Sequence, residues 1–529
     1  MASAEIELKL TIDAASALRL RRDRYLHAVK RGRARNQRLI AVYFDTDALD
    51  LKAAGIALRL RQEGRRRVQT VKCPIGAPGG GVQKRLEVEA PITGTEPDLS
   101  LIDDPSVAER VRAAVGDKTL KPVFSTDVKR TIWMIDQAEG TIELALDEGE
   151  IASAGAEGKS GGRVIVREAE LELKAGSPTA LLAFAEDLRE RVPFRIGGES
   201  KAARGYALFL EASTAIAKAG EPALDPAMSA QQALSAILAD GISQLLANEA
   251  MVLEGTDPEG VHQARVAVRR MRAALSAFTP VLDTANRKHL AKPLRWVQQA
   301  LGPARDWDVF LSETLAPVRA RAGAHPGLTL IEKHAARKRE KAYRQAEKAL
   351  FAKRYQRMIL RLEGFEYSRN PLAEALPVGR FAWELLQQRY DRVRADGGAD
   401  PRDLETEALH ALRIEIKKLR YAVEFFKGLY DPKAVASFLQ ATKKLQDCLG
   451  ALNDAVVAER LLAELVPEAA DPDIEVETEE QARIEEALSV IREVQSEQIQ
   501  AGLAKLSAAW ERLLGERPFW KTGAPPGAA

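Results

Sequence analysis

The hydrophobic pattern changes its period part-way along the 529-residue chain, and this change constrains the fold most strongly. From Ala4 to about Leu210, apolar and polar residues alternate, which is typical of half-buried antiparallel strands. Beyond Pro226 the apolar residues recur with the period of a helix. The segment 213–226 has neither period and is rich in alanine, glycine and proline, so it is predicted to be an interdomain linker.

The amino-terminal part, residues 1–212, is predicted to be a β-rich domain. Its alternating segments include 5–10, 57–61, 69–72, 84–89, 141–147 and 163–174, and a helix is expected over 178–191. Several strands of similar length joined by short turns indicate a closed barrel or a sandwich.

The carboxyl-terminal part, 227–515, is predicted to be an all-α helical bundle. The acidic segment 467–480 is interpreted as a solvated loop within it, and 516–529 as a flexible tail.

Composition points to a cytoplasmic protein. Cys73 and Cys448 lie far apart, so no disulfide framework is expected and a reducing compartment fits. No apolar run approaches the roughly 18 residues of a membrane helix, and the charged motif at Glu5 leaves no room for a secretory signal.

A net charge of only +2 means that local charge, not overall charge, must carry any anion binding. Nothing in the sequence predicts an oligomeric state.

The polar faces of the predicted strands mix carboxylates with cations. Side chains two residues apart share a face of a strand. Five faces show the pattern: Glu5, Glu7 and Lys9; Arg59 and Arg61; Arg85, Glu87 and Glu89; Glu143 and Asp147; Glu168, Glu170, Glu172 and Lys174. If they line a barrel, the carboxylates offer hard oxygen ligands to Mg²⁺ or Mn²⁺ while the cations surround a polyanion. The alternative is that these charges face bulk water around an ordinary core.

The helical half contains an internal repeat with an offset of 148 residues. Leu301-Gly302 corresponds to Leu449-Gly450, and Arg305-Asp306 to Asn453-Asp454. The repeat therefore predicts two related helical hairpins, each ending in a turn, with a pseudo-twofold relation. The matched basic residues are His262, Arg265, Arg269, Arg270, Arg272 and Arg295 in the first copy and His410, Arg413, Lys417, Lys418, Arg420 and Lys443 in the second.

These basic residues are candidates for binding a phosphate polymer. Steps of three and four residues place many of them on one helical face, where like charges repel unless an anion lies among them. Guanidinium groups match phosphate oxygens well. The faces hold few aromatic residues for stacking bases, which disfavours nucleic acid. Cationic neighbours disfavour a metal at His262 or His410. A solvated basic face is the ordinary alternative.

Two ordered sets of motifs resemble known domains. Glu5-Ile6-Glu7-Leu8-Lys9 resembles the ExExK signature of the CYTH, or triphosphate tunnel metalloenzyme, superfamily. The supporting motifs are 43–46, 58–61, 70–72, 85–87, 143–149, 170–174 and 200–206, which together cover almost all of residues 1–210. Residues 227–515 resemble the CHAD domain, through His262 and His410 and the Leu-Gly-x-x-Arg/Asn-Asp pattern that follows each.

The resemblance implies an antiparallel barrel that binds triphosphate with a divalent metal, joined to helices that bind long-chain inorganic polyphosphate. Hydrolysis of inorganic triphosphate is the activity it implies most directly. The alternatives are an adenylate cyclase, another nucleotide or organic triphosphatase, or a non-catalytic scaffold of polyphosphate granules, where the protein could also reside.

Candidate roles in the barrel follow from the charges of the residues. Those assigned to catalysis are Lys9, Glu87, Lys201 and Arg204. Those assigned to substrate binding are Arg59, Arg61, Lys72, Arg85, Arg130 and Lys174. Those assigned to Mg²⁺ or Mn²⁺ are Glu5, Glu7, Asp147, Glu170 and Glu172.

Overall fold

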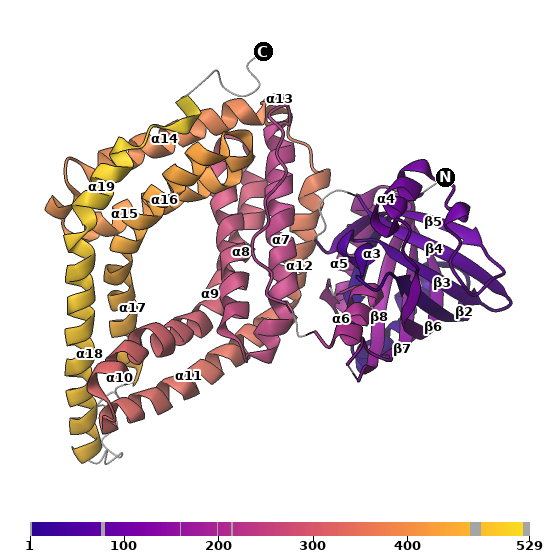
Figure 1. Cartoon of the computed structure of the whole chain (residues 1–529), viewed down its shortest axis with the longest axis horizontal. Helices are drawn as coiled ribbons and strands as arrows, with labels where there is room; N and C mark the ends of the chain where they lie inside the picture. The colour runs from indigo at the N-terminus through magenta and orange to yellow at the C-terminus, as the bar shows by residue number, and fades with distance from the viewer. Residues whose placement is uncertain are drawn as a thin grey trace. The chain divides into compact units, whose positions relative to one another are not determined.

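The computed structural model describes residues 3–75, 80–158, 160–197, 199–212, 215–465 and 478–521. The chain forms two compact units. The first unit comprises Met1–Lys218, Ile242–Ala250 and Leu350–Ser368, and the second comprises Ala219–Gly241, Met251–Ala349 and Arg369–Ala529. The first unit is built around strands, whereas the second is helical (Figure 1).

The described strands of the first unit form a closed antiparallel barrel (Figure 1). They are β1 (Ser3–Thr11), β2 (Lys30–Asp45), β3 (Ala57–Glu63), β4 (Arg66–Pro74), β5 (Val82–Pro91), β6 (Lys121–Gln137), β7 (Gly140–Ser153), β8 (Gly162–Gly176) and β9 (Arg195–Ile196). The order is β5-β4-β3-β2-β6-β7-β8-β1, and β5 also pairs with β1, which closes the ring. β9 pairs with β1 beside this ring.

Helices cover parts of the outer surface of the barrel. They are α1 (Ala14–Arg22), α2 (Arg24–Val29), α3 (Asp50–Ala53), α4 (Pro105–Val115), α5 (Pro178–Arg191) and α6 (Lys201–Leu210). An apolar core that includes Leu51, Leu58, Val71, Val107 and Val111 joins α3 and α4 to the wall. The predicted helix over 178–191 is confirmed as α5; Ser177 caps its first turn and Pro178 opens it.

The alternation along the strands separates two buried faces. On β1, Leu8 and Leu10 are buried on one face, while Glu5, Glu7 and Lys9 on the other face line the interior of the barrel. The outer apolar residues can be buried because other elements cover the wall, and the inner charged residues are enclosed by the closed ring. The predicted inward charged face is therefore confirmed, and the alternative of an outward solvated face is wrong.

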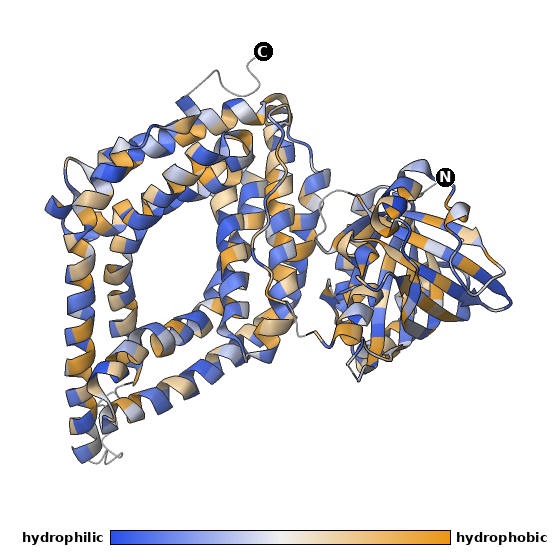
Figure 2. Ribbon diagram, viewed as in Figure 1, coloured by the Kyte–Doolittle hydropathy of each residue, from blue (hydrophilic) through white to orange (hydrophobic). Residues whose placement is uncertain are grey.

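The second half of the chain is helical, as predicted. Its described helices are α7 (Ala230–Glu254), α8 (Pro258–Ala277), α9 (Thr284–Val309), α10 (Ala316–Ala322), α11 (Pro326–Phe351), α12 (Lys353–Gly364), α13 (Pro371–Ala375), α14 (Val378–Gly397), α15 (Thr406–Phe426), α16 (Pro432–Cys448), α17 (Gly450–Leu465), α18 (Thr478–Ala504) and α19 (Leu506–Gly515). Hydrophobic and hydrophilic residues alternate along these helices in Figure 2, as expected for amphipathic helices.

The sequence repeat corresponds to two helical pairs, α8 with α9 and α15 with α16. Val261, Val268 and Leu275 of α8 form the predicted buried stripe. The predicted turn is present only in the second copy, where α16 ends and α17 begins at Gly450. Gly302 instead lies within α9, and a Cβ atom there would stand 2.9 Å from a guanidinium nitrogen of Arg265. This glycine makes room for an arginine rather than forming a turn.

The ends of the helical half differ from the prediction. Phe519 and Trp520 are buried and make aromatic contacts with Phe438, so residues up to 521 belong to the helical core rather than to a flexible tail. Residues 522–529, and most of the acidic segment 467–480, lie outside the described residues. The described part of the predicted linker, 215–226, contains neither helix nor strand.

Helix α7 is long and apolar enough to cross a membrane by length and composition alone, and among the described helices it alone meets that test. Of the relevant window, 56% is buried inside the fold, as in a core helix of a helical bundle.

Candidate active site

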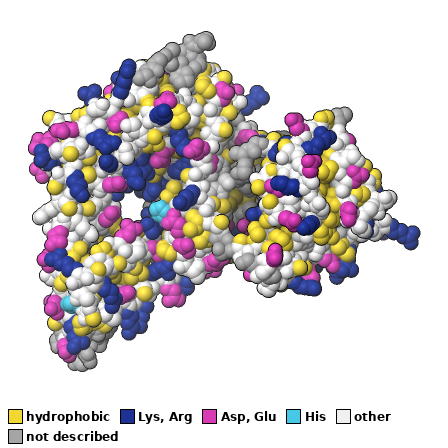
Figure 3. Space-filling view, viewed as in Figure 1, with side chains coloured by type: hydrophobic (Ala, Val, Ile, Leu, Met, Phe, Trp, Pro, Cys, Tyr) yellow, Lys and Arg dark blue, Asp and Glu magenta, His cyan; other side chains and the backbone are white. Residues whose placement is uncertain are grey.

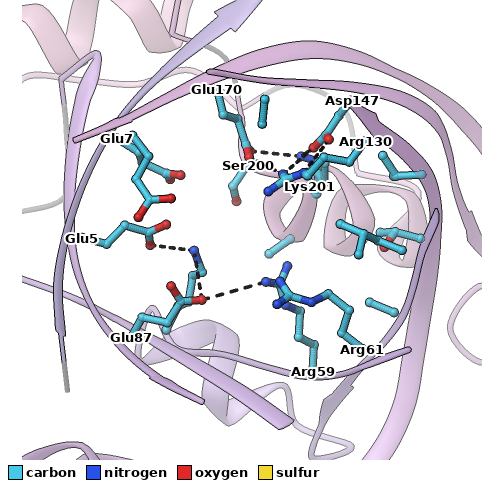
Figure 4. A pocket seen from close by; sticks show the side chains of 18 of the residues that line it. Glu5, Glu7, Arg59, Arg61, Glu87, Arg130, Asp147, Glu170, Ser200 and Lys201 are labelled. Atoms are coloured by element: carbon cyan, nitrogen blue, oxygen red, sulfur yellow. Dashed lines mark hydrogen bonds and ion pairs between the residues drawn. The ribbon is translucent and has the colours of Figure 1, made fainter. Parts of the chain in front are cut away.

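The barrel encloses a cavity of about 280 Å³ (Figure 4). The lining cations are Lys9, Arg35, Arg59, Arg61, Lys72, Arg85, Arg130, Lys174 and Lys201, and the lining carboxylates are Glu5, Glu7, Glu87, Glu89, Glu143, Asp147, Glu170 and Glu172. Nine cations thus face eight carboxylates. One end is nearly closed, since the side chain of Lys201 is 10% exposed, and the other is open, since that of Arg35 is 70% exposed.

A compact ion cluster fills the closed end of the cavity. Lys201 Nζ lies 2.6 Å from Asp147 Oδ2 and 3.0 Å from Glu170 Oε1. Arg130 binds Asp147 through two nitrogens, at 2.7 Å and 2.6 Å, and also contacts Glu170. Lys9 Nζ is 3.0 Å from Glu170 Oε1. Lys201 comes from the first turn of α6, whereas its partners come from strands, so helix and barrel meet at this cluster.

The ion pairs of this cluster hold its groups charged despite burial. Burial alone would raise the pKa of Glu170, but Lys201, Lys9 and Arg130 bring that pKa well below its usual range. The pKa of Asp147 is lowered against burial in the same way, by Lys201 and Arg130. Burial would lower the pKa of Lys201, but Asp147 and Glu170 raise it instead.

A second cluster, on β1, β4 and β5, is less completely neutralised. Lys72 Nζ lies 2.6 Å from Glu5 Oε2 and 3.3 Å from Glu87 Oε1. Glu7 Oε1 accepts no hydrogen bond, although Lys9 and Arg85 lie 3.3 Å and 3.4 Å from it. Burial, together with the charges of Glu7 and Glu87, raises the pKa of Glu5 to about 7 even though Lys72 opposes this change.

Carboxylates in and beside the cavity fit a divalent cation. Asp147, Glu168 and Glu170 are buried, and one oxygen from each lies within 4.8 Å of the others. Their charges are, however, already compensated by Lys201, Arg130 and Lys9. On the Glu5 and Glu7 side, carboxylates repel one another and one buried oxygen has no hydrogen bond. A cation there would relieve both conditions.

Most predicted residues of the barrel line one cavity. Arg204 is the exception: it lies outside the lining set and forms an ion pair with Glu168 on the neighbouring strand. Arg35 and Ser200 line the cavity but carry no predicted role. Arg35 is in phase with Gln37, Leu39, Ala41 and Tyr43 on one face of β2, but this signal is weak because residues 30–38 do not alternate. Ser200 caps the helix that begins with Lys201.

In the helical unit, basic residues of the two repeats meet. Arg269 of α8 acts electrostatically on both Arg413 and Lys417 of α15. Arg269 and Arg420 also place their guanidinium groups 5.9 Å and 5.5 Å from the centre of the Tyr421 ring. Figure 3 shows lysine and arginine side chains, with a histidine nearby, gathered around a central hollow of the helical unit. The predicted duplication therefore produces one shared basic cluster.

Like charge and partial burial shape this cluster. Burial, with Arg413, Arg269 and Arg420, lowers the pKa of Lys417 to about 8. Burial and nearby arginines, Arg305 foremost, also lower the pKa of His262. Such crowding is the arrangement that a bound polyanion would stabilise.

Similar contacts hold the two copies in place, but the partners differ. Arg265 lies 3.7 Å from Asp306, whereas Arg413 donates to Asn453 at 2.9 Å. Asn453 is the counterpart of Arg305, and the counterpart of Asp306 is Asp454. Two residues near the cluster carry no predicted role: Arg305, which acts on His262 and Arg265, and Arg460, which pairs with Asp306 at 2.7 Å.

Several other predicted members of the basic set have different partners or are exposed. Arg270 is buried and donates to Asp240 at 2.6 Å, so assigning it to the anion-binding face is wrong. Arg272 bonds to Gln298, next to Arg295, and Lys418 pairs with Glu415. His410, Arg295 and Lys443 are exposed. The cluster therefore centres on Arg265, Arg269, Arg413, Lys417 and Arg420.

A closed antiparallel barrel with an interior of mixed charge, followed by a helical domain with a duplicated basic face, defines the class of this protein. Residues 3–206 match the CYTH domain and residues 236–463 match the CHAD domain. The chain therefore contains a CYTH domain followed by a CHAD domain, and it belongs with the proteins that combine the two.

Three known proteins illustrate the extent of the similarity. The inorganic triphosphatase of Haemophilus influenzae is 31% identical over 205 residues, covering 39% of this chain and 54% of the relative, so the match spans about half that relative's length. An uncharacterised protein of Mycobacterium tuberculosis is 27% identical over 448 residues, covering 80% of this chain and 81% of that protein. The crystal structure of the CHAD domain from Ricinus communis shares 31% identity with a TM-score of 0.48, covering 58% of this chain and 98% of that one.

Proposed function

We propose that the barrel hydrolyses inorganic triphosphate to diphosphate and phosphate with the help of Mg²⁺ or Mn²⁺. The observation that carries this proposal is the cavity wall, where nine cations and eight carboxylates line one space. A fully ionised triphosphate brings several negative charges more than the wall's single excess positive charge. Divalent cations held by the carboxylates supply the difference. The match to the CYTH domain and the triphosphatase relative support the same activity.

The cationic residues hold and polarise the substrate. Arg59, Arg61, Lys72 and Arg85 lie on neighbouring strands of one wall, and they bind phosphate oxygens over the length of the cavity. Lys201 and Arg130 at the closed end stabilise the charge that develops on the phosphoryl group during transfer. The enclosed wall limits water around the chain and so strengthens each of these contacts.

The carboxylates hold the metal. Glu5 and Glu7 are its best-placed ligands because they are the crowded, incompletely bonded pair, and Glu170 and Glu172 of β8 adjoin them across the β1–β8 ladder. When bound, Mg²⁺ or Mn²⁺ neutralises phosphate oxygens and lowers the pKa of a coordinated water. Glu87 forms an ion pair with Lys72 and so holds that lysine in position to contact the substrate.

An inorganic substrate fits the cavity better than a nucleotide. Among the described lining residues Tyr43 is the only aromatic one, and its hydroxyl accepts from Arg59 at 3.3 Å. A nucleobase would therefore meet charged side chains rather than a stacking surface.

The helical unit is proposed to bind long-chain inorganic polyphosphate. The cluster centred on Arg269, Arg413 and Lys417 combines cations from two helices at one place. Tyr421, between Arg269 and Arg420, is already engaged by their guanidinium groups, so stacking with bases is not its main contact. A polymer of phosphates alone satisfies this surface. The function of the helical unit would be to retain substrate or to place the protein on polyphosphate granules.

Phosphate release from tripolyphosphate and from ATP, each with Mg²⁺ or Mn²⁺, tests the function of the barrel. We expect tripolyphosphate to be the better substrate by at least about tenfold in kcat/KM. Cyclic product from ATP with tripolyphosphate left intact would instead identify a cyclase. Turnover of neither compound, with polyphosphate still bound, would identify a non-catalytic scaffold.

A further inference from the structure

Helix α6 carries Lys201 into the cavity, but the contacts that hold this helix lie outside the cavity. Lys201 is the first residue of α6, and Ser200, which caps the helix, also lines the cavity. One turn later, Gly205 and Tyr206 are buried against the barrel wall. The position of the Lys201 ammonium group therefore depends on how α6 is seated on that wall.

The first anchor of α6 is a buried hydrogen bond to the end of β2. The Tyr206 hydroxyl donates to Asp45 Oδ2 at 2.7 Å, and Asp45 is fully buried. Asp45 is itself fixed by backbone groups, since it accepts from the amides of Leu51 and Lys52 at 2.9 Å each. A carboxylate held at this many points is a rigid acceptor, so it locates Tyr206 closely.

The second anchor is a close approach between α6 and β6. A Cβ atom added at Gly205 would stand 2.2 Å from ring carbons of Phe124, so only glycine allows the helix to lie this near. The Phe124 ring stacks on Tyr43 at 4.5 Å and meets Tyr206 edge-on at 5.2 Å. Tyr43 lines the cavity and stands beside Arg59. The aromatic stack therefore runs without interruption from the cavity wall to the helix.

We propose that Asp45, Phe124, Gly205 and Tyr206, named here the α6 seat, position Lys201 for the reaction of the barrel. This inference rests on the proposed triphosphatase function. None of the four residues is among those lining the cavity, so they act through Lys201 and not on the substrate. Displacing α6 would pull Lys201 from Asp147, Glu168 and Glu170, the carboxylates that fix its ammonium group.

A double-mutant cycle separates positioning from general destabilisation. Gly205→Ala is measured in the wild-type chain and in the Lys201→Ala chain, with tripolyphosphate and saturating Mg²⁺ or Mn²⁺. In the wild type we expect kcat to fall by at least about tenfold with a smaller change in KM. In the Lys201→Ala chain we expect less than about a twofold further loss, because the group being positioned is absent. Equal losses in both backgrounds would overturn the proposal.

A rescue and a matched control complete the test. Phe124→Leu removes ring atoms that a Cβ at position 205 would meet, so the Gly205→Ala, Phe124→Leu chain should regain part of the lost kcat. Tyr206→Phe removes one tyrosine-to-aspartate bond of 2.7 Å, and Tyr343→Phe removes a similar bond of 2.8 Å to Asp308 in the helical unit. We expect Tyr206→Phe to lower kcat and Tyr343→Phe to leave it unchanged. Equal effects of the two tyrosine variants would contradict the role of the seat.

A binding measurement keeps the inference separate from the proposed function. If the wild-type chain binds but does not turn over tripolyphosphate, calorimetric affinity for tripolyphosphate replaces kcat in the same cycle. Gly205→Ala should then weaken binding in the wild-type background and not in the Lys201→Ala background. Equal weakening in both, or none in either, would reject the seat whatever reaction the barrel performs.

Discussion

Lys201 in the barrel and Lys417 in the helical unit differ in how far nearby carboxylates neutralise their charge. Lys201 lies among three carboxylates, and its pKa is raised despite burial. Lys417 lies among arginines, and its pKa is lowered to about 8. The same residue type is therefore a fixed charge in one site and a titratable one in the other, because the sign of its neighbours differs.

The pH dependence of polyphosphate binding should report Lys417. In the free protein Lys417 loses its proton as the pH rises through about 8, whereas a bound anion restores its pKa toward the ordinary 10.5. Binding then takes up a proton, so affinity should fall between pH 8 and 10. Lys417→Arg, which stays charged, should flatten this profile. Calorimetric titration at several pH values measures both effects, and an unchanged slope in the variant would exclude Lys417.

Neighbouring arginines of α8 should respond differently to substitution. Arg270 is bonded to the partly buried Asp240, so Arg270→Ala should lower the free energy of unfolding by about 3 kcal/mol by leaving that carboxylate without its cationic partner. Polyphosphate affinity should stay nearly constant. Arg269→Ala should do the reverse, because Arg269 faces Lys417 and Arg413. Urea denaturation measures the stability of both variants, and a polyphosphate pull-down measures their binding. Weaker binding in Arg270→Ala, with normal binding in Arg269→Ala, would contradict the roles given to the two arginines.

At the scale of elements, the hydrophobic period predicted strands, helices and the faces of their side chains. It did not predict features that depend on contacts between residues distant in the sequence. The alternating charges of β1, β5 and β8 located most of the cavity, and the helical spacing located both basic faces. Closure of the barrel needed the pairing of β1 with β5, which alternation does not encode. Which of Lys201 and Arg204 enters the cavity depends on how α6 packs against the barrel wall, and the sequence does not show this.

The run Arg269-Arg270 shows the same limit in the helical half. Adjacent residues of a helix point about 100° apart, and only tertiary packing shows that Arg270 faces Asp240. The missed Arg35 has a different cause. The first half of β2, from Lys30 to Arg38, is almost uniformly polar, so it lacks the alternation from which a strand is predicted.

Reversing charge on α8 and α15 should separate the two proposed functions. Arg269→Glu with Arg413→Glu replaces repelling cations at the centre of the cluster, so retention of long-chain polyphosphate should fall at least about 100-fold. Tripolyphosphate hydrolysis should be unchanged, since both residues belong to the helical unit.

Arg337→Glu with Lys341→Glu is the matched control for this change. Both residues are exposed on α11, and the net charge changes by the same amount. If the control pair released polyphosphate as effectively, binding would reflect overall charge rather than the cluster.

At the scale of the whole molecule, the two proposed polyanion sites differ in their balance of charge. The barrel balances carboxylates against cations, so under the proposed function it would require added divalent ions to accept a highly charged substrate. The helical cluster has an excess of cations, so we expect it to bind a polyanion without a metal. Removing divalent ions with a chelator should consequently stop hydrolysis and leave polyphosphate bound. A pull-down on polyphosphate with and without the chelator measures this, and release of the protein by the chelator would contradict it.

Metal-dependent phosphate release from tripolyphosphate tests the central claim most directly. The wild-type chain is compared with Glu5→Gln, Glu7→Gln and with the control Glu150→Gln, whose carboxylate pairs with Arg163 on the exposed side of the wall. We predict turnover only with Mg²⁺ or Mn²⁺, a fall of at least about 100-fold in the double variant, and no change in the control. Undiminished turnover in the double variant, or hydrolysis without a divalent ion, would contradict the account.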